Sequence, residues 1–439
     1  MPRDLQGPVA PTFGDAFRFW LKLGFVNFGG PTGQIAIMHE ELVDRRGWLG
    51  DDAFLHALSF CLLLPGPEAQ QLAIYTGWLL NGTEGGIAAG VLFVLPAAVL
   101  MAGLAWLYAA GGELPIVAAI FDGLAAAVVG IVAAAMLSIG GRAVRGRVAA
   151  VVAALAFLAI FVVGVPFPIV VLVAAGTGLA LGPRRLGVTS SDEGSGRSAS
   201  PAPRRRRTFR VLAVGLAAWW IPLLAVVAWT GVDSIYSREG LFFSQVAVIS
   251  FGGAYAVLAY VAHEVVRRFG LSPDDVVAGL ALAETTPGPL ILVVEFYSFL
   301  AAYRNPGALA PVAAGMVGAA VTVWATFAPC FLWVFLGAPW VERLRANRAL
   351  RAALTAVTAA VVGVIASLAL TVAANVLFED VDTARPFFAT IPRPVWSSID
   401  VPSTVVAAAA FVAIRRFRVN VAWVALGGGV AGLLLRGVR

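Results

Sequence analysis

Two short motifs of glycine and proline recur in apolar surroundings and could expose backbone amides to a ligand. Phe28-Gly29-Gly30-Pro31 is matched by Phe251-Gly252-Gly253, and Pro65-Gly66-Pro67 is matched by Pro287-Gly288-Pro289. Paired glycines and prolines interrupt helices, so backbone N–H groups lose their intrahelical partners. A helix that restarts after such a break presents amides and about half a positive charge to an anion. The motifs therefore predict an anion site made of helix ends. The alternatives are close helix packing through the glycines and, at the proline motifs, ordinary surface turns.

Polar residues beside these breaks form a second group of candidates. Gln70 and Gln71 fall in the first turn after Pro67, where their amide groups can donate to an oxyanion. Thr285 and Thr286 are candidate N-caps. Acids in apolar segments are functional candidates, often as proton carriers, although they can equally cap helices or pair with arginine. The acids in this position are Glu68, Glu284 and Glu295.

Charged pairs on two amphipathic stretches could form a gate or a rim that attracts substrate. Glu41 with Arg45, and Glu264 with Arg268, have the i, i+4 spacing of helical ion pairs. A solvated helix face is the equally weighted alternative. His39, His56 and His263 do not form a metal-binding spacing with acids or cysteines, so we predict no metal site and no cofactor. No nucleotide-binding or nucleophile-elbow motif is present, so we expect no enzyme activity and no ATP-driven pumping.

The composition places these motifs in a membrane protein. Of 439 residues, 60% are hydrophobic and 13% charged, against about 25% charged in soluble domains. Apolar runs of about 20 residues recur throughout the chain. The formal charge of +6 fits cytoplasmic loops better than nucleic-acid binding. The first twelve residues contain no apolar signal-peptide core. Two cysteines, both in apolar runs, exclude a disulfide scaffold.

Apolar segments divide the chain into two halves. We predict an N-terminal repeat over residues 1–182, a cytoplasmic linker over 183–210, a lone transmembrane helix over 211–230 and a C-terminal repeat over 231–439. The linker is rich in Ser, Gly, Pro and Arg and cannot bury apolar area. The predicted apolar stretches are 13–28, 53–80, 87–109, 116–139, 148–165 and 169–181 in the first half, and 241–261, 276–300, 311–336, 350–377, 404–414 and 421–435 in the second.

The two halves share an ordered set of residues. A glutamate follows each Phe-Gly-Gly phenylalanine by 13 positions, and a glycine follows six positions later, at Gly47 and Gly270. With a single one-residue gap the two Pro-Gly-Pro motifs then align, and a tyrosine follows the second proline of each by eight positions, at Tyr75 and Tyr297. Ordered agreement of this kind indicates duplication.

The distribution of arginines predicts the orientation of the repeats. Six crossings in each half and one lone helix make about thirteen, and an internal N-terminus then places every arginine cluster in the cytoplasm. The second repeat is upside down relative to the first. We therefore predict an all-α polytopic membrane protein with two homologous six-segment halves in inverted topology and broken or re-entrant helices. Inverted repeats are typical of secondary transporters with a site near the midplane.

Several extended motifs occur in the order typical of a known family. FGGPTGQIAIMHEELVDRRGW and FLHALSFCLLLPGPEAQQLAIYTGWLL in the first half, with LALAETTPGPLILVVEFYSFLAA and FAPCFLWVFLGAPWVE in the second, resemble the chromate ion transporter (CHR) family in its long two-domain form. The resemblance covers nearly the whole chain. It implies a multi-pass carrier of the bacterial inner membrane that exports chromate, confers chromate resistance and is driven by ion gradients.

We therefore expect a secondary transporter for a tetrahedral dianion. Chromate is the first expectation, and sulfate, which shares its charge and shape, is the alternative substrate. Expected partners are the dianion, protons or a counter-anion, and the lipid bilayer, with a homodimer left open and no nucleic acid. A passive oxyanion channel is a second hypothesis. A membrane-bound chromate reductase is a third, for which the sequence offers no flavin, haem or thiol pair.

Overall fold

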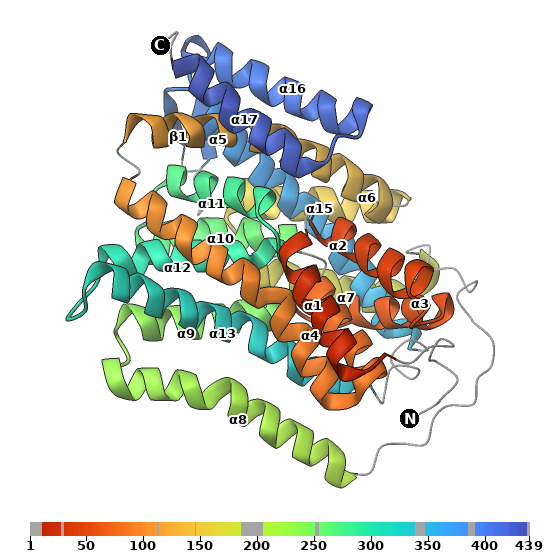
Figure 1. The fold of residues 1–439 in the computed structure, drawn as a ribbon. Coiled ribbons are helices and arrows are strands. Elements are labelled where there is room, and N and C mark those ends of the chain that lie inside the picture. The colour runs from red at the N-terminus through yellow and green to blue at the C-terminus, as the bar shows by residue number, and fades with distance from the viewer. Residues whose placement is uncertain are drawn as a thin grey trace. The chain divides into compact units, whose positions relative to one another are not determined.

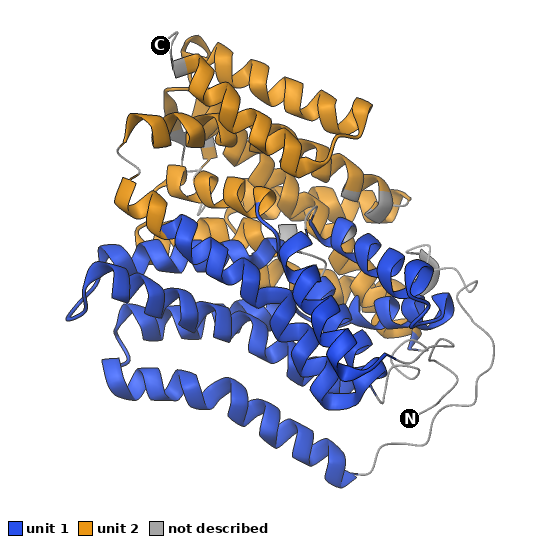
Figure 2. Ribbon diagram, viewed as in Figure 1, with its two compact units in different colours: residues 1–105, 195–254, 286–347 blue, residues 106–194, 255–285, 348–439 orange. Residues whose placement is uncertain are grey.

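The computed structural model describes residues 11–27, 30–111, 114–144, 146–185, 205–250, 254–338, 347–384 and 391–436. The chain is mainly helical (Figure 1) and divides into two compact units (Figure 2). The first unit contains residues 1–105, 195–254 and 286–347, and the second contains 106–194, 255–285 and 348–439. Each unit thus combines elements from both halves of the sequence.

Interrupted helices dominate the first unit. Helix α1 ends at Val26, and α2 begins at Gly30 with Pro31 as its second residue. Helix α3 ends at Cys61, and α4 begins at Glu68, directly after Pro65-Gly66-Pro67. The elements from the N-terminal half are α1 (Phe13–Val26), α2 (Gly30–His39), η2 (Glu40–Arg45), α3 (Asp51–Cys61) and α4 (Glu68–Gly111), the last with non-helical backbone at Asn81 and Gly82.

The C-terminal half contributes the same kind of interruption. Helix α9 ends at Ile249 and α10 begins at Ala254, so the predicted segment 241–261 is divided at the second Phe-Gly-Gly motif. After Pro289 the chain forms a single 3₁₀ turn that leads directly into α12. The elements are α8 (Arg205–Thr230), α9 (Ile235–Ile249), η5 (Leu290–Leu292), α12 (Val293–Arg304) and α13 (Pro311–Gly337).

Long apolar helices form the second unit. Helix α5 is 29 residues long and α15 is 30, and the two occupy the same place in their halves of the sequence. The elements are α5 (Pro115–Ala143), α6 (Arg147–Leu158), η3 (Ala159–Val163), α7 (Phe167–Arg185), α10 (Ala254–Phe269), α11 (Pro273–Thr285), α15 (Arg348–Leu377), α16 (Val401–Phe417) and α17 (Val421–Arg436).

The helices of the second unit pack in reciprocal pairs. Helix α5 packs against α16 and α17, and its counterpart α15 packs against α6 and α7. Gly130 on α5 lies against the backbone of Ala407 and Phe411, and Gly363 on α15 lies against Ala153 and Phe157. The glycine of each half thus faces a helix of the other half, so the two sets of contacts are reciprocal.

These contacts reveal a repeat that the sequence analysis missed. VVAALAFLAI at 151–160 and VVAAAAFVAI at 405–414 agree at eight of ten positions. Each segment supplies the alanine and the phenylalanine that face the glycine of the other half. An alignment of α6 with α16 would have found the signal, but the low complexity of alanine-rich helices obscures it.

Helices α5 and α17 run antiparallel. Gly432 of α17 lies against the carbonyl of Ala119 on α5. Gly428, which is one turn earlier on α17, lies against Ala127, which is two turns later on α5. Close approach at Gly123, Gly428 and Gly432 brings the two backbones together without side chains between them.

A short pair of strands accompanies the helices. Strands β1 (Val381–Ala384) and β2 (Ile391–Pro394) lie between α15 and α16 and pair antiparallel, in a fold that is otherwise helical as predicted. Helix α8 begins at Arg205, before the predicted start of the lone helix at residue 211, because arginine is a good helix former.

Five described helices are long and apolar enough to cross a membrane: α4, α5, α8, α13 and α15. Helices α6 with η3, α7 and α17 contain shorter apolar stretches. The predicted total of about thirteen crossings stays a prediction. Only 11% of the most apolar 18-residue stretch of α8 is buried, whereas half or more of the corresponding stretch is buried in the other four helices. Most of the surface of α8 is therefore exposed.

We predict that Gly130→Leu and Gly363→Leu destabilise the protein to a similar extent. Each new side chain would overlap backbone atoms of the facing helix, and overpacking costs about 1–3 kcal/mol or more. Thermal unfolding in detergent measures the effect. Gly176→Leu is the control, because a Cβ at this exposed glycine meets no atom within 4 Å. Equal unfolding temperatures for all three variants would contradict the reciprocal packing.

Candidate functional site

The helix breaks of the first unit have closely similar backbone geometry. Asn27, which follows α1, has φ −87° and ψ 67°, and Ser250, which follows α9, has φ −77° and ψ 73°. The two residues stand at equivalent positions, one before each Phe-Gly-Gly motif. This conformation is that of an inverse γ-turn, which ends a helix sharply. The chain therefore turns in the same way at both sites.

Two backbone hydrogen bonds join the breaks across the repeats. The N–H of Gly66 donates to the carbonyl of Ser250 at 2.8 Å, and the N–H of Gly288 donates to the carbonyl of Asn27 at 2.9 Å. Each Pro-Gly-Pro glycine thus binds the residue before the Phe-Gly-Gly motif of the other repeat. We call this pair of hydrogen bonds the reciprocal clasp. It joins the four breaks in two pairs, and the two members of each pair lie far apart in the sequence.

Only glycine fits the clasp without strain. Gly66 has φ +118° and Gly288 has φ +103°, backbone conformations that residues with a Cβ rarely adopt. A Cβ on Gly288 would also overlap that of Ala97, and one on Gly66 would stand 3.0 Å from the sulfur of Cys330. The amides of Gly66 and Gly288, expected from the sequence to face an anion, are occupied by the clasp in this structure.

Four buried carboxamide side chains surround the clasp. Gln34 Nε2 donates to the carbonyls of Gly288 at 2.5 Å and Asn27 at 3.3 Å. Gln71 Nε2 donates to the carbonyl of Pro65 at 2.6 Å. Gln70 Nε2 lies 3.5 Å from the carbonyl of Gly90. Gln70 and Gln71 lie in the first turn of α4, as the sequence analysis predicts.

Asn27 is the most unusual of these groups. Asn27 is fully buried, and neither Nδ2 nor Oδ1 of its side chain has a hydrogen-bond partner among the described residues. The Oε1 atoms of Gln34, Gln70 and Gln71 are also buried without a partner in that set. Burying an amide without a hydrogen bond costs about 1–3 kcal/mol. Such groups are therefore expected where a ligand or water completes them.

The remaining predicted site residues fall into three groups. Phe28, Gly29, Phe251, Gly252 and Gly253 lie outside the described residues. Thr285 does not cap a following helix, because its hydroxyl donates to the carbonyls of Ala281 and Leu282 in the last turn of α11. Glu284 and Thr286 are both buried. Hydroxyl bonding to the preceding turn is the usual behaviour of threonine inside helices.

Two predicted acids stand near the starts of helices. Glu68 is the first residue of α4 and is half-buried. Glu295 lies in the first turn of α12, is 3% exposed, and its Oε2 atom has no hydrogen-bond partner in the described part of the chain. The two acids do not occupy equivalent positions in the repeats, so they have no shared role by symmetry.

The predicted ion pairs form, and each gains an extra arginine. Glu41 in η2 pairs with Arg45 at 3.0 Å and Arg46 at 3.2 Å. Glu264 in α10 pairs with Arg267 at 2.6 Å and also with Arg268. Burial raises the pKa of both carboxyls, but hydrogen bonds from the arginines outweigh it and hold each pKa below its ordinary value.

An open basic pocket adjoins α1 and η2. Arg18, Lys22 and Arg46 line it, together with Asp15 and two aromatic rings. The Arg46 guanidinium lies 5.1 Å from the centroid of Phe19 and 4.8 Å from that of Trp48, so the rings hold this cation in place. The pocket provides positive charge that is accessible from solution.

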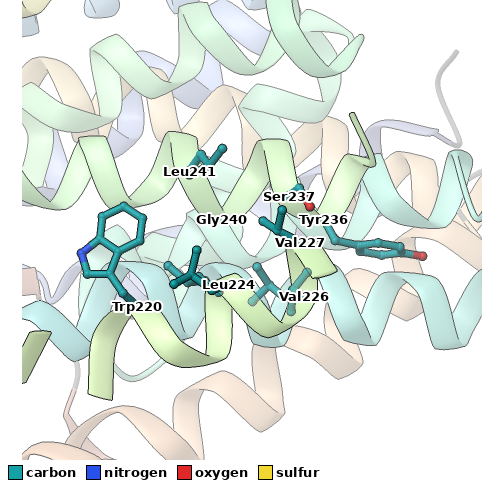
Figure 3. Close-up of a pocket in the computed structure, with 10 residues that line it drawn as sticks. Trp220, Leu224, Val226, Val227, Tyr236, Ser237, Gly240 and Leu241 are labelled. Carbon is teal, nitrogen blue, oxygen red and sulfur yellow. The ribbon is translucent and has the colours of Figure 1, made fainter. Parts of the chain in front are cut away.

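A second pocket lies between α8 and α9 and is apolar (Figure 3). Trp220, Leu224 and Val227 face it from α8, and Leu241 and Tyr236 from α9. Its polar groups already have partners: Ser237 Oγ donates to the carbonyl of Gly231 at 2.7 Å, and the Tyr236 hydroxyl donates to that of Pro306 at 3.3 Å. This pocket does not suit a dianion.

The sequence analysis missed Asn27, Gln34 and Ser250. Each stands within a few residues of a Phe-Gly-Gly motif and is polar in an otherwise apolar segment, which is the signal that could have found it. It also missed Glu239, a fully buried acid in α9. Among the described residues, no three His, Cys, Asp or Glu side chains cluster to hold a metal ion.

We predict that His39 contributes pH-dependent stability. Its Nε2 lies 2.6 Å from Asp51 and its Nδ1 lies 3.3 Å from Asp44. The hydrogen bond to Asp51 raises the pKa of His39 above its ordinary value of 6.5, against a smaller effect of burial. The stabilisation of the folded state by His39 is complete at a pH below its ordinary pKa, and it is lost as the pH rises through the raised pKa of the folded state.

Unfolding temperatures measured from about pH 6 to about pH 8 test this prediction. The difference between the wild type and His39→Gln should shrink as the pH rises. A difference for His39→Gln that grows with pH would contradict the assignment.

Comparison with known proteins identifies the family. The profile of the chromate transporter family matches residues 14–179 and 239–433. A probable chromate transport protein from Synechococcus elongatus is 28% identical over 333 residues, 75% of this chain and 77% of the relative. The chromate transport protein of Cupriavidus metallidurans is 28% identical over 338 residues, 76% of this chain and 77% of the relative.

A further relative covers almost the full length of both proteins. The chromate transport protein of Pseudomonas aeruginosa is 29% identical over 440 residues, 98% of this chain and 94% of the relative. No solved structure gives a significant match. The two stretches matched by the family profile cover both sets of helix breaks and most of the chain, and this protein therefore belongs to the chromate transporter family.

Proposed function

We propose that this protein is a secondary transporter that exports chromate across the bacterial inner membrane and confers chromate resistance. The observation that carries the proposal is the reciprocal clasp, with the unpartnered Asn27 amide beside it. The names of the relatives, which describe chromate transport, support the choice of substrate. In this proposal the N-terminus and the linker are cytoplasmic, as the distribution of arginine predicts.

Neutral donors suit a dianion that must be released on both sides of a membrane. Carboxamide N–H groups and the N-terminal amides of α2 and α4 offer hydrogen bonds and partial positive charge without a buried cation. A full charge at this depth would be costly and would hold the ion tightly. We assign binding to the Asn27 Nδ2 donor, to the helix ends at Gly30 and Pro67, and to Gln34, Gln70 and Gln71 once their Nε2 groups leave the carbonyls that they bind in this structure. Such a site would separate chromate from sulfate poorly, because the two ions share charge and shape.

The clasp also suggests how access could alternate. The Gly66 and Gly288 amides hold carbonyl groups in this structure, and moving one repeat against the other would release them for the anion. The breaks at Pro287-Gly288-Pro289 and at Phe251-Gly252-Gly253 would take part with Thr286. Secondary transporters with interrupted helices rock in this way around a central site.

Inverted topology is part of the proposal and has support from helix direction. Helices two apart in a membrane chain cross in the same direction, so α5 and α7 should be parallel. Helix α17, the counterpart of α7, runs antiparallel to α5. The two halves are then oppositely oriented, provided that α6 with η3 crosses the bilayer.

Clusters of basic side chains could attract the anionic substrate to the entrance of the transport path. Arg18, Lys22 and Arg46 line one open pocket, and Arg267 and Arg268 flank Glu264 in the other half. Clusters of one sign raise the local concentration of an oppositely charged ligand. We assign Glu41 with Arg45 and Glu264 with Arg268 to this rim or to a gate.

Expression in a chromate-sensitive bacterium tests the function. We expect cells with the protein to accumulate less chromate than cells with an empty vector. Inside-out vesicles should take up chromate in a saturable way that responds to collapse of the ion gradient, whereas a channel would not respond in this way. Competition with sulfate and molybdate ranks the substrates. Accumulation equal to that of the empty vector would remove the chromate assignment.

We predict that Asn27→Leu lowers transport at least about tenfold without lowering stability, since a lost charge-assisted hydrogen bond is worth about 1.5–3 kcal/mol. The side chain has no partner to lose among the described residues, and leucine has a similar volume. The clasp uses the Asn27 carbonyl, which the variant keeps.

Asn375→Leu is the matched control. Its Nδ2 donates to the carbonyl of Thr371 at 2.8 Å, so this variant should lose stability and keep transport. Vesicle uptake and thermal unfolding measure the two effects. Full transport by Asn27→Leu would remove Asn27 from the site.

A further inference from the structure

Glu239 is a buried acid in the first unit. It lies in the second turn of α9, is 0% exposed, and both of its carboxyl oxygens lack a hydrogen-bond partner among the described residues. An ionised carboxylate without a partner is very costly at such a position, so burial favours the protonated carboxyl group.

The surroundings of Glu239 are small and polar. A Cβ placed on Gly318 of α13 would lie 2.9 Å from Glu239 Oε2 and 2.9 Å from the carbonyl of Ser298 on α12. The hydroxyl of Ser298 accepts a hydrogen bond from Thr322 Oγ1 at 2.7 Å. The glycine thus leaves room for the carboxyl group next to the backbone of Ser298.

A line of buried small and polar residues continues from there along α13. Gly318, Thr322, Thr326 and Cys330 recur every four residues, so they share one face of the helix. Thr326 Oγ1 is buried without a partner in the described ranges, and Cys330 lies beside the Gly66 position of the clasp. Over these twelve residues α13 rises by about 18 Å. We call these four residues the α13 stripe.

The ionisable groups near Glu239 lie on α9 itself and on the helices that pack against α9. Arg238 and Tyr236, on α9 itself, interact with it electrostatically. The arginines of α8 stand in its first turns, remote from the turn that leads into α9. The ionisable side chains on α12 and α13, which pack against α9, are Glu295, Tyr297, Tyr303, Arg304 and Cys330.

We propose that Glu239 is a proton-carrying residue and that the α13 stripe connects it to the clasp. A proton from water on one side binds a carboxylate oxygen of Glu239. It leaves to water on the other side along the stripe and regenerates the carboxylate. One proton crosses for each such cycle, and no electrons are transferred. This inference rests on the proposed transport function and adds the coupling ion to it.

Purified protein in liposomes tests the proposal with two assays. Counterflow exchanges labelled chromate for unlabelled chromate and needs no net proton movement. A pH-sensitive dye inside the liposomes records proton movement when chromate is added. Glu239→Gln resembles the protonated acid, so we expect it to keep counterflow and to lose proton movement at least tenfold. Exposed Glu84 supplies the control, Glu84→Gln, which should keep both.

The outcomes separate this inference from the function on which it rests. Absence of counterflow in the wild type would refute the transport function itself and the inference with it. Wild-type proton movement in Glu239→Gln would overturn the inference alone. Loss of counterflow in Glu239→Gln would also overturn it, because the acid would then serve anion binding or folding.

The stripe and the protonated acid have tests of their own. Thr326→Val should slow proton movement and spare counterflow, while Thr358→Val, whose hydroxyl bonds to the Leu354 carbonyl at 2.8 Å, should change neither. Infrared spectra should contain a C=O stretch of a buried carboxylic acid that Glu239→Gln lacks. Identical spectra in this region, or equal proton movement in Thr326→Val, would count against the path.

Discussion

Two backbone hydrogen bonds hold together the part of this protein on which its chemistry depends. Each joins the glycine of one Pro-Gly-Pro motif to the residue before the Phe-Gly-Gly motif of the other repeat. In a hydrocarbon environment a free amide or carbonyl is costly, so broken helices survive only where their ends satisfy one another. The clasp meets this requirement for one amide and one carbonyl in each pair of breaks, and Gln34 and Gln71 donate to further carbonyls beside it.

The same reciprocity recurs in the second unit through packing instead of hydrogen bonds. Gly130 and Gly363 each admit the backbone of a helix from the other half. Close backbone approach through small residues is the main way in which helices associate in membranes, where burial of apolar surface provides little drive. Duplication explains why both units show the same exchange: a contact that stabilises one pairing of halves is repeated by symmetry.

The sequence predicts the breaks well because proline and glycine act locally. The interruptions at residues 65–67 and 287–289 follow from backbone geometry alone, as do the ion pairs of Glu41 and Glu264. The sequence did not predict Asn27 or Glu239 as site residues. Both are singled out by buried polar atoms without a hydrogen-bond partner among the described residues, and this burial depends on helices that are distant in the chain. The sequence analysis did not predict the pairing of β1 with β2, because this pairing joins two segments that are not contiguous in the sequence. The role of the Gly66 and Gly288 amides also changed, because the sequence shows that they are freed but not which acceptor they meet.

An experimental structure with bound chromate would show directly whether the anion binds at the helix breaks beside Asn27. Chromium scatters X-rays anomalously, so its position can be found independently of the protein. The account predicts a chromium peak within hydrogen-bond reach of the Asn27 side chain, between the breaks that the clasp connects. A peak held by the arginines of the basic pocket alone, with none at the breaks in any state, would contradict it.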